Sequence, residues 1–302
     1  MKGTLVSDRT ILVTGGSGFI GSHLVRRLLT EYPSAHIVSL DNYFTGRRDV
    51  ECDDPRVTYI EADTASINKV WPQQQIADPD LVFHLGEYAR IPQSFDEFDR
   101  VWEYNTWGTK EVVKFCNDRG ARLVYAGSSS KFGNDGEDEN LNPYAWTKAK
   151  NGELIRNYGD WYGLDYVITY FYNVYGPGQI EEGRYATVIG IFERQYREGE
   201  PLTVVSPGTQ TRDFTHIDDT IDGLVMCGEH GKGDGYLIGS GHELPVVEVA
   251  KMFGTEYTLV PSLRGERVRG EADNSKMRTL GWEPRRTVEK YVADVVAAHT
   301  AR

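Results

Sequence analysis

The feature that most constrains this chain is a glycine-rich turn near its start, set between a short apolar run and an amphipathic segment. Residues 10–14 read TILVT, the pattern of a buried strand. Glycines follow at 15, 16, 18 and 21, and residues 20–29 carry apolar side chains at helical spacing. A strand that turns directly into a helix predicts the β-turn-α opening of a parallel sheet.

Further apolar runs, separated by helical or loop-like stretches, extend this pattern along the first half of the chain. They lie at residues 36–40, 57–60, 81–85, 122–126 and 166–172. Two longer segments, 95–119 and 143–162, carry apolar residues on more than one face, which predicts helices that are deeply buried or form a subunit interface. Strands that alternate with helices predict an α/β fold with a Rossmann-type, doubly wound parallel sheet.

The spacing of the glycines has a physical logic. Gly15 permits the tight turn, Gly18 lets the backbone approach a pyrophosphate, and Gly21 allows the helix to pack closely on the strand. The N–H groups at the start of the helix, at Phe19 and Ile20, attract such an anion because they lack intrahelical partners. This turn is therefore a candidate dinucleotide site.

An acidic residue further along the chain strengthens the prediction of a dinucleotide site. Asp41 follows Gly21 by 20 positions, where a carboxylate accepts hydrogen bonds from an adenosine ribose and repels a 2′-phosphate. The pattern predicts NAD rather than NADP, although Arg47 and Arg48 follow in the next loop. Asp63, after the third apolar run, is a candidate to bind the adenine, but a loop or cap role suits it nearly as well.

Tyr144 and Lys148 lie one helical turn apart, so both side chains emerge on one face. A neighbouring ammonium and a positive nicotinamide would favour the tyrosine phenolate, a usable general base. With 18 tyrosines in the chain, the pair alone could equally be an exposed helix pair. Its context is the serine triplet from Ser128, which ends a predicted strand where parallel sheets place chemistry. A serine there could hold a reacting hydroxyl against Tyr144, although serine-rich loops are commonly turns.

Taken in order, these motifs resemble the extended short-chain dehydrogenases/reductases, and among them the NAD-dependent nucleotide-sugar epimerases of the UDP-hexose 4-epimerase type. The resemblance covers nearly the full length. The matching segments are GGSGFIG at 15–21, DN at 41–42, HLG at 84–86, Asn105, the serines from Ser128, Tyr144 with Lys148, NVYGP at 173–177, RDFTHIDD at 212–219 and LGW at 280–282.

The resemblance implies a role for each matching residue. Ser128 would be the hydroxyl partner, Tyr144 the base and Lys148 the residue that orients the cofactor ribose. Further cofactor positions would be Asn42, Leu85, Gly86 and Asn105, and further substrate positions Ser129, Asn173, Arg212 and Arg264. The two arginines would balance two phosphates. From the residues alone, Arg212 could instead cap Asp218 or Asp219, and Arg264 could be a surface residue.

The implied reaction is oxidation and re-reduction at one sugar carbon through a transient keto-sugar, most directly C4 epimerization of a UDP-hexose or UDP-N-acetylhexosamine. The implied organisation is an NAD-binding domain at 1–172, to which 215–240 returns, and a smaller nucleotide-sugar lobe over 173–302. A Gly- and Pro-rich run at 176–183 marks the change of lobe. The resemblance also implies a homodimer, with 95–119 and 143–162 as its four-helix interface.

Several alternatives stay open. Ser129 and Ser130 stand where related dehydratases carry Asp-Glu, which disfavours dehydration. Arg90 could pair with a substrate carboxylate, as in a UDP-uronate 4-epimerase or decarboxylase, or Glu87 and Arg90 could neutralise each other. The short acidic loop 134–139 could widen the sugar pocket for an N-acetyl group. A hypothesis of another class is a catalytically silent NAD-binding protein, which retention of Ser128, Tyr144 and Lys148 opposes.

Composition excludes several classes of function. Lys and Arg number 33 against 45 Asp and Glu, so the net charge of −12 disfavours nucleic acid and anionic membranes as partners. Cys52, Cys116 and Cys227 lack metal-ligand spacing and cannot all pair in disulfides, which favours a reducing compartment and no metal site. With neither a leader nor a membrane-spanning apolar run apparent, we predict a cytoplasmic enzyme.

Overall fold

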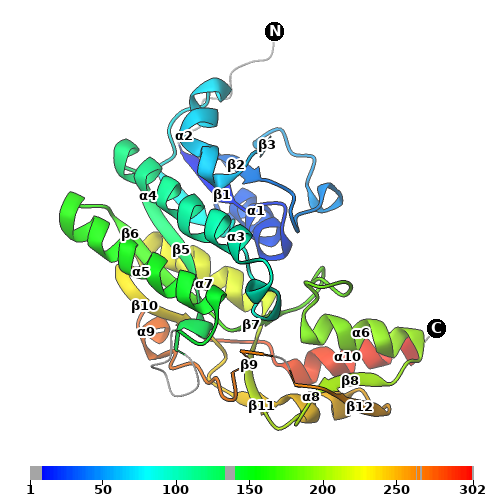
Figure 1. Cartoon of the computed structure of the whole chain (residues 1–302). Coiled ribbons are helices and arrows are strands. Elements are labelled where there is room, and N and C mark those ends of the chain that lie inside the picture. The colour runs from blue at the N-terminus through cyan, green and yellow to red at the C-terminus, as the bar shows by residue number, and fades with distance from the viewer. Residues whose placement is uncertain (1–8, 133–139, 263, 266, 301–302) are drawn as a thin grey trace.

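The computed structural model describes residues 9–132, 140–262, 264–265 and 267–300. Its centre is a parallel sheet of seven strands in the order β10-β6-β5-β4-β1-β2-β3, flanked by helices (Figure 1). The strands are β1 (Thr10–Thr14), β2 (His36–Asp41), β3 (Val57–Glu61), β4 (Leu81–His84), β5 (Arg122–Ser128), β6 (Tyr166–Phe171) and β10 (Gly233–Ile238). The order reverses direction between β1 and β4, which confirms the predicted doubly wound Rossmann-type fold.

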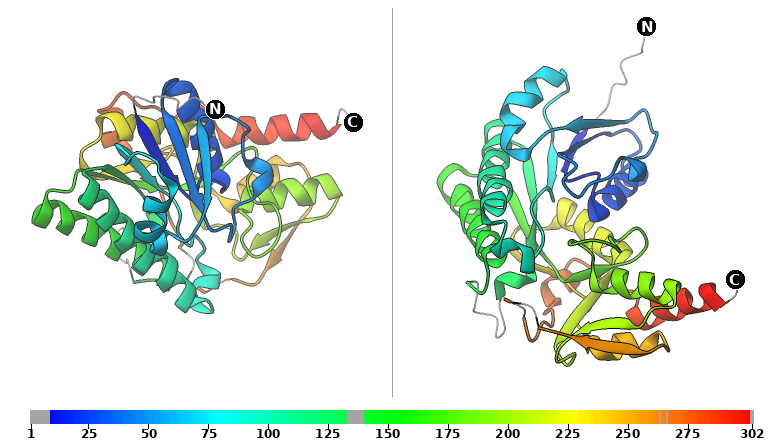
Figure 2. Two further views of the ribbon diagram at one scale, coloured as in Figure 1. Left: turned by 90° about the horizontal axis from the view of Figure 1, so that it is seen from above. Right: turned by 45° about the vertical axis from the view of Figure 1, so that its right-hand side comes forward.

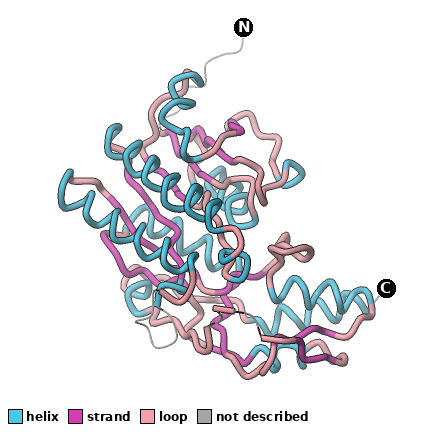
Figure 3. The backbone as a smooth tube through the Cα atoms, viewed as in Figure 1, coloured by secondary structure: helices cyan, strands magenta, loops and turns pink. Residues whose placement is uncertain are grey.

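Long helices cover both faces of this sheet (Figure 3). They are α1 (Phe19–Glu31), α4 (Gly108–Arg119), α5 (Pro143–Tyr162) and α7 (Ile217–His230). Ile11 and Val13 of β1 pack with α1 and α7, whereas Leu12 packs with α4 and α5. Successive side chains of a strand point to opposite faces, so a continuous apolar run is what a sheet covered on both sides requires.

The predicted helix over 95–119 is interrupted. The chain forms a 3-10 turn η4 (Pro92–Phe95), a short helix α3 (Phe98–Val101), a π-helical turn η5 (Trp102–Trp107) and then α4. In contrast, α5 spans the predicted residues 143–162. Asn142 caps it by accepting a hydrogen bond from Ala145 N at 2.8 Å, Pro143 occupies its first position, and Gly163 ends it at φ 77°.

Short helical turns lie between the longer elements of the chain. They are η1 (Arg48–Val50), η2 (Thr64–Ser66), α2 (Ile67–Val70), η3 (Trp71–Gln74), η6 (Ser129–Phe132) and α9 (Ser275–Arg278). In the described part of the chain, the structure contains no helix with the length and apolar character needed to cross a bilayer.

A smaller α/β lobe follows β6 in the chain and packs beside the carboxyl ends of the large sheet (Figure 2). Its strands are β7 (Asn173–Tyr175), β9 (Thr211–His216) and β11 (Glu243–Pro245) in one sheet, and β8 (Leu202–Val205) and β12 (Tyr257–Val260) in another. Its helices are α6 (Val188–Glu198), α8 (Val246–Met252) and α10 (Val288–Thr300), which enclose a separate apolar core. The segment that forms α7 and β10 lies with the large sheet, where β10 pairs with β6.

Candidate active site

A cavity of about 720 Å³ lies where the carboxyl ends of the parallel strands meet the smaller lobe. Its walls come from the glycine turn after β1, from the ends of β2, β4, β5 and β6, from the start of α5 and from β9. Open α/β sheets bind their ligands at this edge, and the volume suits a small-molecule ligand. Most of the predicted site residues line this one cavity, and three do not: Asp63, Asn105 and Arg264.

One end of the cavity is built for a phosphate group. Gly15 has φ +70°, in the left-handed region that favours glycine, and a Cβ on Gly21 would clash with the Gly15 carbonyl oxygen. Gly18 is the N-cap residue of α1 and has no side chain to cap the helix, and Phe19 and Ile20 of the first turn line the cavity. The open N–H groups of this turn and the close packing allowed by glycine fit the pyrophosphate of NAD.

Asp41 ends β2 at the same end of the cavity. Its carboxylate accepts hydrogen bonds from Ser17 N at 3.0 Å and from Tyr43 N at 2.8 Å. Burial raises the pKa of Asp41, while these two amides favour its ionised form. Asn42 lines the cavity and donates to Asp63 Oδ1 at 2.7 Å, so Asp63 is held as the partner of Asn42. This arrangement agrees with the loop role considered for Asp63.

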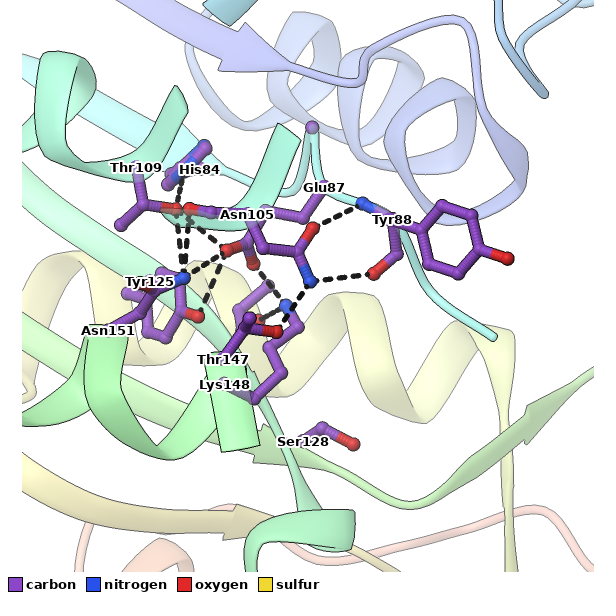
Figure 4. Close-up of polar contacts among 12 residues, drawn as sticks. His84, Glu87, Tyr88, Asn105, Thr109, Tyr125, Ser128, Thr147, Lys148 and Asn151 are labelled. Atoms are coloured by element: carbon purple, nitrogen blue, oxygen red, sulfur yellow. Dashed lines mark hydrogen bonds and ion pairs between the residues drawn. The ribbon is translucent and has the colours of Figure 1, made fainter. Parts of the chain in front are cut away.

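The three predicted catalytic residues line the cavity wall, and Figure 4 shows two of them, Ser128 and Lys148. Ser128 ends β5, and its Oγ accepts hydrogen bonds from Ser130 Oγ at 2.9 Å and from Ser130 N at 3.2 Å. Tyr144 and Lys148 lie on α5, and Lys148 Nζ donates to the Ala126 carbonyl oxygen at 2.7 Å. The strand end and the first turns of the helix thus bring together a hydroxyl, a phenol and an ammonium.

Asn105 lies behind this wall and is fully buried. Its Oδ1 accepts from Tyr88 N at 2.6 Å, and its Nδ2 donates to Tyr88 O and to Thr147 Oγ1, both at 3.1 Å. The side chain therefore connects the π-helical turn to the segment after β4 and to α5. In this structure Asn105 supports the cavity wall from outside the cavity lining.

The expected neutralisation between Glu87 and Arg90 is wrong. Glu87 turns inward and pairs with Lys148, an interaction that sequence reasoning missed because 61 residues separate the two (Figure 4). Arg90 instead donates from Nε to the Tyr185 carbonyl oxygen at 2.6 Å and from Nη1 to Ala89 O at 2.8 Å. Burial lowers the pKa of the Arg90 guanidinium, which lines the cavity.

Two arginines of the smaller lobe, Arg212 and Arg267, also line the cavity. Arg212 donates from Nη1 to Thr211 O at 2.9 Å and to Arg267 O at 2.7 Å, and Arg267 donates to Ser129 O at 2.6 Å. Burial and the neighbouring Arg212 lower the pKa of Arg267 to about 10. The capping role considered for Arg212 does not apply, because Asp218 pairs with Arg286 and Asp219 accepts from the amides of residues 285 and 286.

Arg264 lies outside the cavity lining. Its guanidinium is exposed and stacks on the ring of Phe95, 4.1 Å from the centroid. Arg267, three residues further on, is the buried one. Arginines at 264, 267 and 269 offered a signal for a cation here, but nothing in their spacing tells which one turns inward.

Asn173, at the start of β7, lines the cavity and donates to the Asp213 carbonyl oxygen at 3.0 Å. The loop at 134–139, considered for its effect on the sugar pocket, lies outside the described residues. Across the described ranges, no three His, Cys, Asp or Glu side chains gather in a way that could hold a metal ion.

Known proteins that act on nucleotide-linked sugars are similar to this chain. The chain is 30% identical to UDP-glucuronic acid decarboxylase 5 of Arabidopsis thaliana, covering 92% of this chain and 86% of the relative. It is 27% identical to a trifunctional UDP-glucose 4,6-dehydratase/UDP-4-keto-6-deoxy-D-glucose 3,5-epimerase/UDP-4-keto-L-rhamnose-reductase of the same plant, covering 94% of this chain but only 46% of that longer protein. The solved UDP-glucose 4-epimerase of Thermus thermophilus in complex with NAD has a TM-score of 0.86 at 26% identity, covering 96% and 99% of the two chains.

The family comparison covers most of the chain. Residues 11–239 match the NAD dependent epimerase/dehydratase family, a range that runs from β1 through β10. NAD, predicted from the glycine turn and Asp41, is the cofactor of this family. The resemblance inferred from the motifs is thereby confirmed. The chain belongs to the NAD dependent epimerase/dehydratase family.

Proposed function

We propose that this chain is an NAD-dependent epimerase that inverts C4 of a nucleotide-linked sugar, a UDP-hexose or a UDP-N-acetylhexosamine. One observation carries this conclusion: Ser128, Tyr144 and Lys148 line the same cavity as Arg212 and Arg267. Two guanidinium groups match the two phosphates of a nucleotide diphosphate. The activities of these relatives on UDP-linked sugars support the choice of nucleotide.

In this proposal the protein moves the proton and holds the sugar. Ser128 Oγ holds the reacting hydroxyl, and Tyr144 takes the hydroxyl proton as a phenolate and later returns it. Lys148 favours the phenolate by its charge. NAD held at the glycine turn and Asp41 would supply reversible hydride transfer at the sugar carbon. Arg212 and Arg267 anchor the diphosphate while the keto-sugar turns over and presents its other face.

The test is product formation from a panel of substrates. We expect the protein with NAD to convert UDP-glucose or UDP-N-acetylglucosamine into its C4 epimer, followed by proton NMR, and to reach the same ratio from either epimer. Conversion of UDP-glucose or dTDP-glucose into a 4-keto-6-deoxy sugar would assign dehydration instead. Absence of turnover across the panel, with NAD binding measured by calorimetry, would assign a silent NAD-binding protein.

A uronate substrate is the second candidate, because Arg90 lines the cavity and a decarboxylase of UDP-glucuronic acid is among the relatives. If Arg90 binds a substrate carboxylate, Arg90→Ala weakens turnover of UDP-glucuronic acid far more than that of UDP-glucose. Equal losses on the two substrates would reject the carboxylate contact. Release of carbon dioxide distinguishes decarboxylation from epimerization of the uronate.

We also propose a homodimer formed through the surface of α4 and α5. Large aromatic side chains are exposed on and beside these helices: Trp107 is 52%, Trp161 63% and Tyr162 64% exposed. Exposed large aromatic side chains are typical of protein interfaces. A cytoplasmic location stays a prediction from the sequence, as does the domain boundary at 172.

A further inference from the structure

We propose that Glu87 is a positioning residue that keeps Lys148 protonated and fixed at the wall of the cavity. Its effect on the rate rests on the proposed function, whereas the charge pair itself can be tested without turnover. Three features of the structure carry the inference: the depth of the pair, the hydrogen bonds around the carboxylate, and the uncharged state of the neighbouring titratable groups.

The pair is deeply buried. The Glu87 side chain is 1% exposed and that of Lys148 5% exposed, and the two are in contact. An isolated charge at this depth is strongly disfavoured, whereas two opposite charges in contact compensate each other. Each member therefore requires the other in its ionised form.

The surroundings of Glu87 select the carboxylate (Figure 4). Its Oε1 accepts hydrogen bonds from Thr109 Oγ1 and Asn151 Nδ2 at 2.7 Å, and from Tyr125 Oη at 3.2 Å. Its Oε2 accepts from Lys148 Nζ. These neighbours all donate, and an ionised carboxylate is an acceptor only.

The same arrangement fixes the direction of Lys148. An ammonium has three N–H donors. In the described part of the chain, one goes to Glu87 and one to the Ala126 carbonyl oxygen, which leaves the third for the cavity that Lys148 lines. Glu87 thus holds the Lys148 ammonium in an orientation in which its third N–H faces the cavity.

Other titratable groups face this pair from the elements packed around it. Burial lowers the pKa of His84, on β4, to about 4, and burial raises the pKa of Tyr125, on β5, well above its ordinary value. Both are therefore uncharged between pH 6 and 9. The element α4 contributes Thr109, which does not titrate. The charge beside Tyr144 is consequently set by Glu87, Lys148 and Arg90.

Removing the charge of Glu87 would leave Lys148 as an unpaired buried ammonium, which gives up its proton at a lower pH. Loss of that proton removes the charge that favours the Tyr144 phenolate. We expect the consequence to fall on the catalytic step, because the proposed diphosphate anchors, Arg212 and Arg267, bind other groups, the carbonyl oxygens of Thr211, Arg267 and Ser129. A change in kcat on the alkaline side, without a change in KM, is the expected signature.

The kinetic test measures kcat and KM from pH 6 to 10 for Glu87→Gln and Glu87→Asp. In Glu87→Gln we expect kcat at pH 8 to fall about tenfold, KM to change less than about twofold, and the alkaline fall in kcat to begin about one pH unit lower. Glu87→Asp, which keeps the charge, restores the position of the alkaline fall. A lower kcat with an unmoved profile in Glu87→Gln would reveal a packing role and overturn the proposal.

Glu193→Gln is the matched control. Glu193 is also buried, it accepts hydrogen bonds from Gln179 Nε2 at 2.6 Å and Tyr291 Oη at 2.9 Å, and it lies outside the cavity lining. Its pH profile should overlay that of the unaltered protein. A shift of the profile in this variant as large as that in Glu87→Gln would show that the effect is not specific to the pair and would overturn the proposal.

The second test needs no substrate and measures melting temperature against pH. Glu87→Gln leaves a buried ammonium whose proton is held less tightly in the folded than in the unfolded chain, so its stability rises with pH. Lys148→Met leaves a buried carboxylate with the opposite shift, so its stability falls as pH rises. At pH 7 we expect each variant to melt about 5 °C or more below the unaltered protein.

The double variant Glu87→Gln/Lys148→Met removes both charges and should recover most of that loss. Additive losses in the double variant would overturn the proposed pairing. Because these measurements require only folded protein, they hold even if none of the nucleotide sugars is turned over, and so separate a failure of the pair from a failure of the proposed epimerase activity.

Discussion

At the scale of single residues, the cavity wall combines groups that the chain supplies from distant places. Ser128 comes from the end of β5, Tyr144 and Lys148 from α5, and Glu87 from the segment after β4. Tyr144 is 8% exposed, so the phenol reaches the cavity from an otherwise buried position. Such a group can exchange a proton with a bound ligand while water is largely kept away.

Tyr144→Phe tests the proposed base directly. The substitution removes only the phenolic oxygen, so we expect turnover to fall by about 10²–10⁴-fold. NAD binding, measured by calorimetry, should be nearly unchanged, because the ring and Lys148 remain. Tyr158→Phe on the same helix, outside the cavity lining, is the control and should retain activity. Retention of more than about a tenth of the turnover in Tyr144→Phe would assign proton transfer to another group.

His84 predicts how stability depends on pH. It is buried, Nδ1 lies 2.7 Å from Thr14 Oγ1 and Nε2 lies 2.9 Å from Thr109 Oγ1, and burial lowers its pKa to about 4. The unfolded chain binds this proton near pH 6.5, so the contribution of neutral His84 is present above that pH and is lost as the pH falls toward 4.

We therefore expect the unaltered protein to lose more stability than His84→Asn between pH 7.5 and 4.5. The loss in the free energy of unfolding between these pH values should be larger in the unaltered protein by on the order of 2 kcal/mol. At pH 7.5 itself, His84→Asn is the less stable protein because it gives up a hydrogen bond. Urea unfolding of both proteins at the two pH values measures these losses. Equal losses in the two proteins would contradict the proposed neutral state of His84.

At the scale of elements, local sequence signals predicted whether a segment is a helix or a strand better than they predicted whether a helix is continuous. The strand at residues 10–14 and the helix at 143–162 match β1 and α5, because a short apolar run, a proline at the first helical position and an Asn cap act over a few neighbours. The stretch 95–119 contains a π-helical turn, and its apolar pattern did not reveal it. That turn carries Asn105, whose side chain binds the backbone at Tyr88, a contact made only in the folded chain.

The junction of β1 and α1 gives a prediction at this scale. Gly21→Ala forces a methyl group against the Gly15 carbonyl oxygen, so α1 must shift; we expect a loss of about 1–3 kcal/mol in unfolding free energy. NAD affinity should weaken about tenfold or more, because the shift moves the first turn of α1 away from the pyrophosphate.

Gly152→Ala within α5 is the matched control. The nearest atom to its added methyl group is Arg156 Nη1 at 3.7 Å, so this helix gains about 0.5–1 kcal/mol instead. Urea unfolding measures the free energy of unfolding of both variants, and calorimetry measures their affinity for NAD. Equal effects of the two substitutions would show that the packing of α1 on the glycine turn is not what requires Gly21.

At the scale of the whole molecule, the large sheet and the smaller lobe meet around one cavity, and contacts across it hold a segment of the smaller lobe in place. Arg90 and Gln93 from the segment after β4 donate to the carbonyl oxygens of Tyr185 and Arg184, and Tyr185 Oη donates to Glu97 at 2.8 Å. These bonds connect the sheet side of the cavity to residues 184 and 185, so the two lobes jointly define the shape of the site.

The proposed dimer is tested at the same scale. We expect light scattering coupled to size exclusion to give twice the mass of one chain. Substituting Trp107 and Trp161 with lysine introduces charge into the proposed interface and should shift the protein toward the monomer mass. Leu259→Lys on β12, where Leu259 is 56% exposed, is the control and should leave the mass unchanged. A monomer mass for the unaltered protein would reject the interface.

The sequence by itself determined the features that depend on near neighbours: the glycine turn, the carboxylate after β2, and the shared face of Tyr144 and Lys148 one helical turn apart. Those spacings decide backbone conformation and direction within a few residues. Only the tertiary structure decided that Glu87 pairs with Lys148, that Arg90 holds the carbonyl of Tyr185, and that Arg267 rather than Arg264 enters the cavity. The reason is physical: these contacts join distant segments, and which charged side chain is buried depends on the packing of the whole fold.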